Sequence, residues 1–177
     1  MKDKFFVAFN SGDAASVIAL FAPDAEFTNN FGPIERRDFE ELLAWNVAQG
    51  TRYTPSDCAA DVGGAADVVS VSCPFITHNA VSQASGGPPV PFLMTVDVTA
   101  AGIVAHTDRF GDPDFNVVHR PFERWMNEHH PEDTEAVSFG TWNSIAEAEQ
   151  NGTLVALYGA EWGEYLETNG CAFNETC

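Results

Sequence analysis

The segment that decides the fold is FNSGD at residues 9–13, followed by VIALFAPDAEF at residues 17–27. An apolar helical stripe precedes it and ends at its Asn-Ser-Gly, which favours a turn. This stripe consists of Phe5, Phe6 and Phe9. Asp13 is a good N-cap for a second helix, which a Pro-Asp pair ends. The sequence therefore predicts two short helices that lead into a strand at residues 25–29.

The apolar spacing changes from the helical period to a period of two after the third expected helix, which Asp38 caps and Gly50 ends. Strands are expected at residues 51–58, 67–81, 90–99 and 102–110. Short or Gly-rich connections predict that they form an antiparallel meander, with residues 82–91 as the one long hairpin loop. A helix at residues 120–128, with Pro121 in its first turn, and a strongly amphipathic last helix follow. The apolar stripe expected on the last helix consists of Leu154, Leu157, Tyr158, Trp162, Tyr165 and Leu166.

The opening motif resembles the SnoaL-like branch of the nuclear transport factor 2-like superfamily, and residues 102–112 are similar to the last strand of that family. The order of elements agrees through about residue 128. The resemblance implies an α+β fold, a cone-shaped barrel whose N-terminal helices pack in a curved antiparallel sheet and leave a mostly apolar pocket open at one end. We therefore expect a SnoaL-like barrel domain at residues 1–128 and a C-terminal helical extension at residues 129–177.

Three polar side chains on the expected sheet are candidate catalytic residues: Asp108, His106 and His78. A turn within residues 99–102 would place Asp108 opposite Leu93, and the preceding hairpin would place His78 opposite the same leucine from its other side. The resemblance implies an acid/base aspartate on the last strand, a role that Asp108 would take. An imidazole beside it would complete the pair needed for proton transfer next to a carbonyl. A slip of one residue, or a bulge, would instead turn these side chains to the outer face.

Candidate substrate-binding residues are Trp45, Tyr53 and Thr95. The same register places Thr95 opposite His106. Trp45 and Tyr53 are more often core residues than ligand contacts, so both alternatives stay open. The alternate residues of the last two strands form a more apolar set that would equally suit the face that meets the helices: Phe92, Met94, Val96, Val98, Ile103 and Ala105.

Two enzymatic branches of the superfamily do not match the sequence. The epoxide-hydrolase branch needs an Arg-x-Asp pair on a middle strand, and no arginine lies between Tyr53 and Asp108. The ketosteroid-isomerase branch needs carboxyl groups at positions that hold Asn29 and Leu93 here. The remaining hypothesis is a general acid/base enzyme of the isomerase, cyclase, dehydratase or hydrolase type, without cofactor or metal, that acts on an apolar or carbonyl-bearing small molecule. The alternative is a non-catalytic ligand-binding or dimerisation module.

The charge of the chain excludes polyanionic partners. Its 8 Lys+Arg and 26 Asp+Glu give a formal net charge of −18, whereas nucleic acids and acidic membranes are bound by clusters of basic residues. No apolar run is long enough to span a membrane. Half of the acidic residues, but only two basic ones, follow residue 110. The expected partners are therefore a small-molecule ligand and, from the resemblance and an exposed sheet face, a second copy of the chain.

The four cysteines bear on the cellular compartment. Cys58 and Cys73 flank a Gly-Gly turn, and a hairpin centred between residues 65 and 66 would place them opposite each other for a disulfide. Cys171 and Cys177 could close a small ring. Two local pairs are typical of an exported protein, secreted or periplasmic, whereas four reduced thiols would indicate a cytoplasmic one. The spacings are not those of a metal site.

Overall fold

The computed structural model describes residues 2–61, 67–110, 116–137, 140 and 142–173. Its first half contains α1 (Lys2–Asn10), α2 (Ala14–Ile18), β1 (Phe21–Asn29), β2 (Gly32–Ile34) and α3 (Arg36–Ala48). The elements that follow are β3 (Arg52–Pro55), β4 (Ala59–Asp61), β5 (Val69–His78), α4 (Ala80–Ser85), β6 (Val90–Thr99) and β7 (Gly102–Phe110). The described chain ends with α5 (Asn116–His129), α6 (Thr134–Val137) and α7 (Ile145–Asn169).

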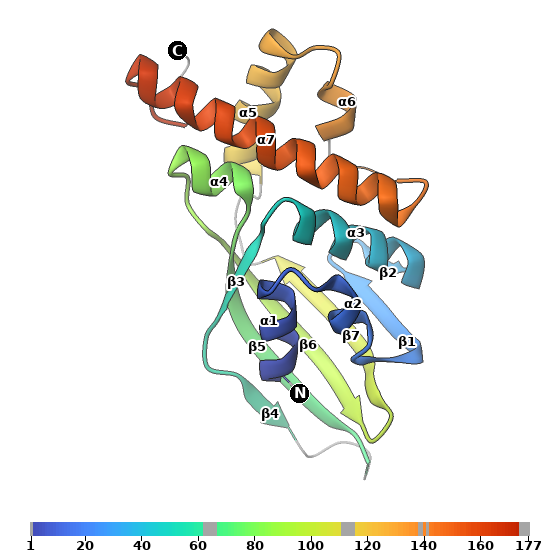
Figure 1. Ribbon diagram of the computed structural model, residues 1–177. Helices are drawn as coiled ribbons and strands as arrows, with labels where there is room; N and C mark the ends of the chain where they lie inside the picture. The colour runs from blue at the N-terminus through green and yellow to red at the C-terminus, as the bar shows by residue number, and fades with distance from the viewer. Residues whose placement is uncertain (1, 62–66, 111–115, 138–139, 141, 174–177) are drawn as a thin grey trace.

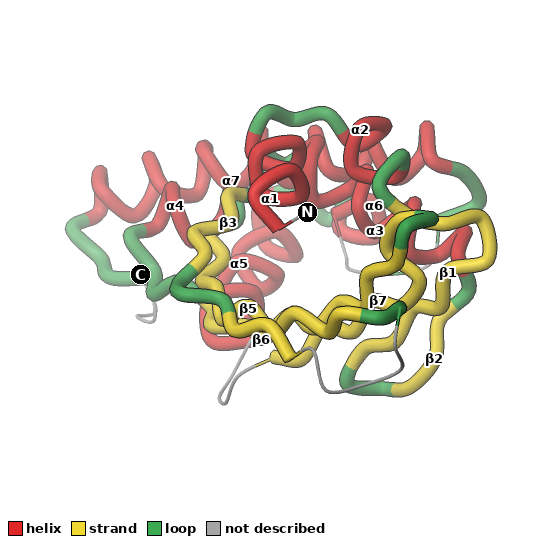
Figure 2. The backbone as a smooth tube through the Cα atoms, turned by 90° about the horizontal axis from the view of Figure 1, so that it is seen from below, coloured by secondary structure: helices red, strands yellow, loops and turns green. Residues whose placement is uncertain are grey.

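A curved sheet encloses the N-terminal helices, and the C-terminal helices lie across one end of it (Figure 1). Seen from below, the strands form an arc with α1 and α2 on its hollow side (Figure 2). The strand order is β2-β1-β7-β6-β5-β3, and β4 pairs with β5. The strands β3, β5, β6 and β7 pair antiparallel, which confirms the meander, while β1 runs parallel to β7. The observed fold is therefore the predicted one, an α+β barrel with a helical extension.

Local sequence explains where the N-terminal helices begin. Asp13 caps α2 as predicted, because its Oδ1 accepts a hydrogen bond from the Ser16 backbone N–H at 2.9 Å. Asp38 does not cap α3. That helix begins at Arg36, with Glu35 at the N-cap position and no side-chain hydrogen bond there. Asp38 instead lies in the first turn, where a negative charge favours the helix dipole.

Two later segments also differ from the expectation. The expected loop at residues 82–91 contains the end of α4, whose start is closed by a capping box between Asn79 and Ser82. Asn79 Oδ1 accepts from the Ser82 N–H at 2.8 Å, so the chain turns into a helix where a strand was expected to continue. Pro121 lies inside α5 and not in its first turn, because the helix already begins at Asn116.

The described residues pack around two separate apolar clusters. The first lies between the sheet and α1 to α3 and includes Phe9, Phe27, Phe39, Phe75 and Met94. The second lies between α3, α4, α5 and α7 and includes Trp45, Val81, Phe122, Trp125 and Trp162. The C-terminal helices thus have a core of their own, to which α3 contributes one face.

Helix α7 reaches α3 and α4 through small residues. A Cβ atom at Gly152 would lie 2.4 Å from the Trp45 carbonyl oxygen, and one at Gly163 would lie 2.5 Å from the Ala84 carbonyl oxygen. The buried side of this helix therefore follows its glycines, and only part of the expected stripe of large residues is buried. Leu157, which was expected in that stripe, is 59% exposed.

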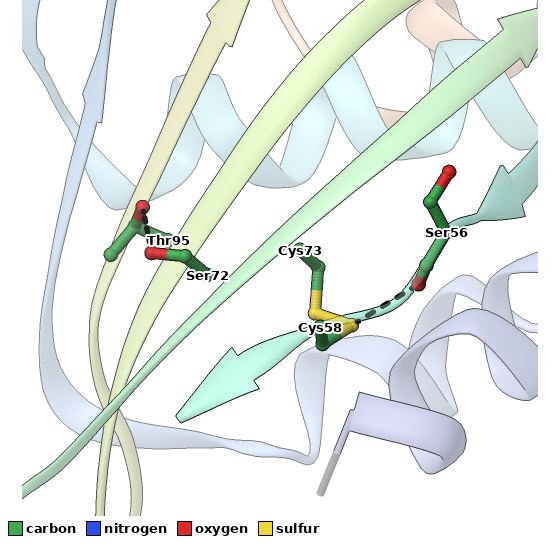
Figure 3. Close-up of a disulfide and its surroundings, with 5 residues drawn as sticks. All are labelled: Ser56, Cys58, Ser72, Cys73 and Thr95. Carbon is green, nitrogen blue, oxygen red and sulfur yellow. Dashed lines mark hydrogen bonds between the residues drawn. A yellow bond between two sulfur atoms is a disulfide. The ribbon is translucent and has the colours of Figure 1, made fainter. Parts of the chain in front are cut away.

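Cys58 and Cys73 form a disulfide with Cα atoms 4.2 Å apart, as predicted (Figure 3). The neighbouring pair Ala59 and Ser72 has the predicted register. Cys171 is also disulfide-bonded, and its predicted partner, Cys177, lies outside the described residues. Within the described part of the chain, no helix is long and apolar enough to cross a membrane.

Candidate functional site

Strand β7 carries two candidate residues that the structure brings together. Its pairing with β6 has a register shift before Val98, which leaves Val104 as an extra residue in β7. Such a β-bulge changes the side to which every later residue points. Asp108 consequently lies opposite Met94. The prediction that it lies opposite Leu93 is wrong, because it assumed a regular strand from the turn onward.

His106 is affected in the same way and lies opposite Val96, not opposite Thr95 as predicted. Val96 and Met94 are 2% and 1% exposed, so this side of the sheet is the concave side that meets the helices. Since side chains two residues apart point to the same side of a strand, His106 and Asp108 share the concave side. The members of the more apolar set in β6, together with Ile103, therefore face the core, whereas Ala105 lies opposite Asp97 on the convex side.

His106 lies in a box of phenylalanine rings and is only 2% exposed. Four ring centroids lie within 6.3 Å of its own, at distances of 5.1 Å (Phe39), 5.6 Å (Phe21), 5.8 Å (Phe5) and 6.3 Å (Phe27). Phe5 comes from α1, Phe39 from α3 and the other two from β1. We call these four residues the phenylalanine box. It leaves the imidazole almost no surface that another molecule can touch.

The imidazole and the carboxylate form a hydrogen-bonded pair. His106 Nε2 lies 2.9 Å from Asp108 Oδ2, and the two side chains are 2% and 31% exposed. Asp108 is thus the outer member of the pair. His106 Nδ1 and Asp108 Oδ1 are both buried and have no hydrogen-bond partner within the described structure. One carboxylate oxygen is therefore held and the other is free.

His78 does not join this pair. Strand β5 pairs with β6 so that Pro74, not His78, lies opposite Leu93. The predicted arrangement is wrong because α4 takes up residues that were assigned to the strand and the loop, which moves the pairing by four residues. His78 lies at the end of β5 opposite Arg52, and by alternation it points to the convex side.

Thr95 and Trp45 also lie away from the pair. Thr95 is on the convex side, where its hydroxyl oxygen lies 3.2 Å from that of Ser72 on the next strand (Figure 3). Trp45 belongs to the second apolar cluster, with its ring 5.7 Å from that of Trp142. Neither residue is placed to contact a molecule that Asp108 contacts.

Tyr53 does lie on the concave side, and its ring stacks on that of Phe9 with centroids 3.6 Å apart. Burial raises the pKa of the Tyr53 phenol well above its usual value of 10.0, and the negative charge of Asp108 raises it further. The phenol consequently keeps its proton throughout the physiological pH range. It is a neutral hydrogen-bond donor in the electrostatic field of the carboxylate.

The sequence reasoning missed a partly buried histidine, His119 on α5. Asn79 Oδ1 accepts from the Ser82 N–H, so the Asn79 amide nitrogen donates to His119 Nε2 at 2.8 Å. Burial lowers the pKa of His119 from 6.5 to about 4. His119 is therefore a neutral acceptor that joins α5 to the start of α4, and the expected helix entry at this position gave no signal of that role.

The phenylalanine box was missed as well, although its members were visible as apolar residues of the first helices and strand. Their convergence on His106 depends on the parallel pairing of β1 with β7, in which Phe27 lies opposite His106. No group of three or more His, Cys, Asp or Glu side chains among the described residues could hold a metal ion. A hollow of about 510 Å³ lies on the outer side of α1, beside Phe6 and Pro55.

The protein has a curved, mostly antiparallel sheet around its N-terminal helices, and a polar pair lies on the concave side of that sheet. It therefore belongs to the class of cone-shaped α+β barrels of the nuclear transport factor 2-like superfamily. The chain belongs to the SnoaL-like domain family, whose model matches residues 3–106. The match extends from α1 into β7 and ends two residues before Asp108. The C-terminal helices lie outside it.

Several solved structures are similar to the chain. A protein of unknown function with a cystatin-like fold from Nostoc punctiforme has a TM-score of 0.50 and 13% identity over 65% of this chain and 88% of its own. A proposed ketosteroid isomerase from Kribbella flavida has a TM-score of 0.49 and 16% identity over 63% and 76%. A proposed polyketide cyclase from Xanthomonas campestris has a TM-score of 0.47 and 19% identity over 62% and 87%. The similarity to the Nostoc punctiforme protein, at 13% identity, shows the fold alone. Among curated proteins, no sequence matches the chain.

Proposed function

We propose that this SnoaL-like protein binds an apolar or carbonyl-bearing small molecule and catalyses a proton transfer on it by cofactor-independent general acid/base catalysis. The reaction class is that of an isomerase, cyclase, dehydratase or hydrolase. The observation that supports this proposal is the Asp108 carboxylate, whose Oδ2 is held by His106 while Oδ1 is buried and unpartnered. A free carboxylate oxygen beside an apolar wall suits a base that removes a proton from carbon.

Tyr53 supplies a second group for the same chemistry. When the Asp108 carboxylate takes a proton from the carbon next to a carbonyl, the electron pair of the broken C–H bond forms a C=C bond, and the π pair of the carbonyl moves onto its oxygen. The protonated Tyr53 phenol, with its pKa raised by burial, is suited to donate a hydrogen bond to that oxygen. Asp108 then returns the proton to another carbon or to a leaving oxygen, so the enzyme ends in its initial state.

The compartment, the oligomeric state and the domain boundary belong to the same proposal. The Cys58–Cys73 disulfide is typical of an oxidising compartment and favours an exported protein. A homodimer stays a proposal that rests on the family resemblance. The division into residues 1–128 and 129–177 is likewise proposed, and the packing of α5 side chains in the second apolar cluster favours a boundary nearer to the end of β7.

The experiment combines binding and turnover. A panel of cyclic ketones, lactones and epoxides is screened by thermal shift, and compounds that bind are then assayed for turnover with wild type, Asp108→Asn and Asp97→Asn. We expect Asp108→Asn to lower kcat by about 10² to 10⁴-fold. Asp97 is the matched control, because it lies on the convex side of the neighbouring strand, where its carboxylate accepts a hydrogen bond from Ser70.

Turnover by Asp108→Asn at the wild-type rate would contradict the role of Asp108. Ligands that bind without turnover by any variant would instead support the alternative function, a ligand-binding module without catalysis.

A further inference from the structure

We infer that His106 is a positioning residue: it holds the Asp108 carboxylate through Oδ2 and exchanges no proton with the substrate. The catalytic part of this inference rests on the proposed function. The geometric part concerns the resting protein and needs no substrate.

The burial of the imidazole separates it from any substrate. His106 is 2% exposed, and the phenylalanine box surrounds its ring with four centroids at 5.1 to 6.3 Å. Within the part of the chain that the structure describes, its imidazole makes one hydrogen bond, the 2.9 Å contact with Asp108. A ligand would have to displace a phenylalanine ring to reach Nδ1, whereas 31% of the Asp108 side chain is exposed, at atoms other than the buried Oδ1. The substrate therefore meets the carboxylate and not the imidazole.

The surroundings of the two ring nitrogens decide which of them carries the proton. With the proton on Nε2, the ring donates to Asp108 Oδ2, and the bare Nδ1 lies among phenyl groups. With the proton on Nδ1, an N–H donor would be buried without an acceptor, which costs about 1–3 kcal/mol. The lone pair on Nε2 would also face a carboxylate oxygen. The Nε2–H tautomer of His106 is consequently the one that fits.

This tautomer fixes what Asp108 can do. Its Oδ2 is occupied by the Nε2–H donor, so the carboxylate cannot rotate freely about its terminal bond without losing that hydrogen bond. When the substrate C–H bond breaks, the proton forms an O–H bond on the Asp108 carboxylate, and the proton on Nε2 stays on His106 throughout. The imidazole thus orients the base, and no relay of protons through His106 is required.

The resting geometry is tested by NMR on the full chain labelled with ¹⁵N-histidine. Long-range ¹H–¹⁵N spectra separate the two neutral tautomers, and we expect His106 as Nε2–H with a slowly exchanging proton. In Asp108→Ala, which removes the acceptor, we expect that protected proton signal to be lost. In Asp108→Asn, whose amide oxygen can still accept, we expect it to persist. An Nδ1–H tautomer, or a signal unchanged in Asp108→Ala, would overturn the inference.

The catalytic part is tested with two replacements of His106. In His106→Phe, an aromatic ring of similar size fills the box without a donor, while in His106→Gln an amide N–H can replace Nε2–H. We expect His106→Phe to lower kcat by about 10²-fold with little change in KM, because the base is misplaced and binding is not. We expect His106→Gln to recover most of that loss, which a merely structural role for His106 would not predict.

The outcomes separate this inference from the proposed function. If His106→Gln loses as much activity as Asp108→Asn, the imidazole itself transfers a proton and the inference is wrong. If His106→Phe is as active as wild type, positioning by His106 is excluded. If no compound of the panel is turned over, the proposed function loses its support, while the tautomer experiment still decides whether His106 holds Asp108.

Discussion

The replacement of Gly152 by alanine tests the docking of α7 on α3, which joins the C-terminal helices to the family domain. An alanine Cβ at this position would lie 2.4 Å from the Trp45 carbonyl oxygen and 2.9 Å from the Ala48 Cβ. Ordinary contacts begin near 3.4 Å, so the helices must separate by about 1 Å. The nearest obstacle is backbone, which cannot rotate away, and overpacking of this kind costs about 1–3 kcal/mol.

Gly159→Ala is the matched control on the same helix. Its Cβ would lie 3.4 Å from the nearest atoms of Val81, which is a normal contact. Both substitutions gain about 1 kcal/mol of helix propensity, so the difference between Gly152→Ala and Gly159→Ala isolates the steric cost.

We expect Gly159→Ala to be neutral or more stable than wild type, and Gly152→Ala to be less stable than Gly159→Ala by about 1–3 kcal/mol. The free energy of unfolding is measured in urea, and a parallel thermal melt should show a Tm difference of about 2–4 °C per kcal/mol. Equal stability of the two variants would refute the close approach of α7 to α3.

Three further predictions concern the disulfide and two titrating groups. The double replacement of Cys58 and Cys73 by alanine should lower the free energy of unfolding by about 3 kcal/mol, and an unchanged urea midpoint would contradict a structural role for the bond. Burial lowers the pKa of His119 from 6.5 to about 4, so on acidification the imidazole is protonated in the unfolded chain before it is protonated in the folded one. The free energy of unfolding should therefore fall between pH 6.5 and 4, by at most about 3 kcal/mol. In His119→Gln, the free energy of unfolding should depend less on pH over this range. Because burial raises the pKa of Tyr53, the ultraviolet difference between wild type and Tyr53→Phe should show no phenolate at pH 10.5, and a signal there would contradict the buried phenol.

The barrel could be predicted from sequence because its signals are local. The period-2 pattern predicted β6 and β7 within the observed bounds, and the symmetry of the Gly-Gly turn predicted the disulfide between Cys58 and Cys73. Asp13 was identified as a cap from its position before an apolar helical stripe. These features depend on residues near one another in the chain, so the spacing alone carries the information.

The neighbours of Asp108 could not be predicted in the same way, because they depend on a β-bulge in β7 and on the helix α4. Both features have weak signals in the local sequence. The bulge residue, Val104, is a β-branched residue typical of regular strands. The helix α4 lies in a Ser-, Ala- and Gly-containing stretch that also suits a loop, and its capping residue, Asn79, became evident only from the hydrogen bonds to Ser82. The error for His78 followed from this helix, and that for the neighbours of Asp108 followed from the bulge.

The negative charge of the chain and the chemistry of the pair belong to different parts of the molecule. Half of the 26 acidic residues follow residue 110, beyond the family match and beyond β7. The rings that surround His106 are phenyl groups, which carry no charge. The excess acidity of the extension indicates how the C-terminal helices meet solvent.

The bulge at Val104 is what allows one strand to complete the core and to present a base. Ile103 is 1% exposed and lies on the concave side next to the turn. In a regular strand Ile103 would share that side with Ala105, Thr107 and Arg109, while His106 and Asp108 would point outward. The extra residue after Ile103, Val104, reverses the side to which the later residues of β7 point. Ile103 near the turn and the His106–Asp108 pair further along the strand therefore all lie on the concave side. A change that only removed charge from Asp108 would leave this geometry intact, which is why Asp108→Asn tests chemistry and not folding.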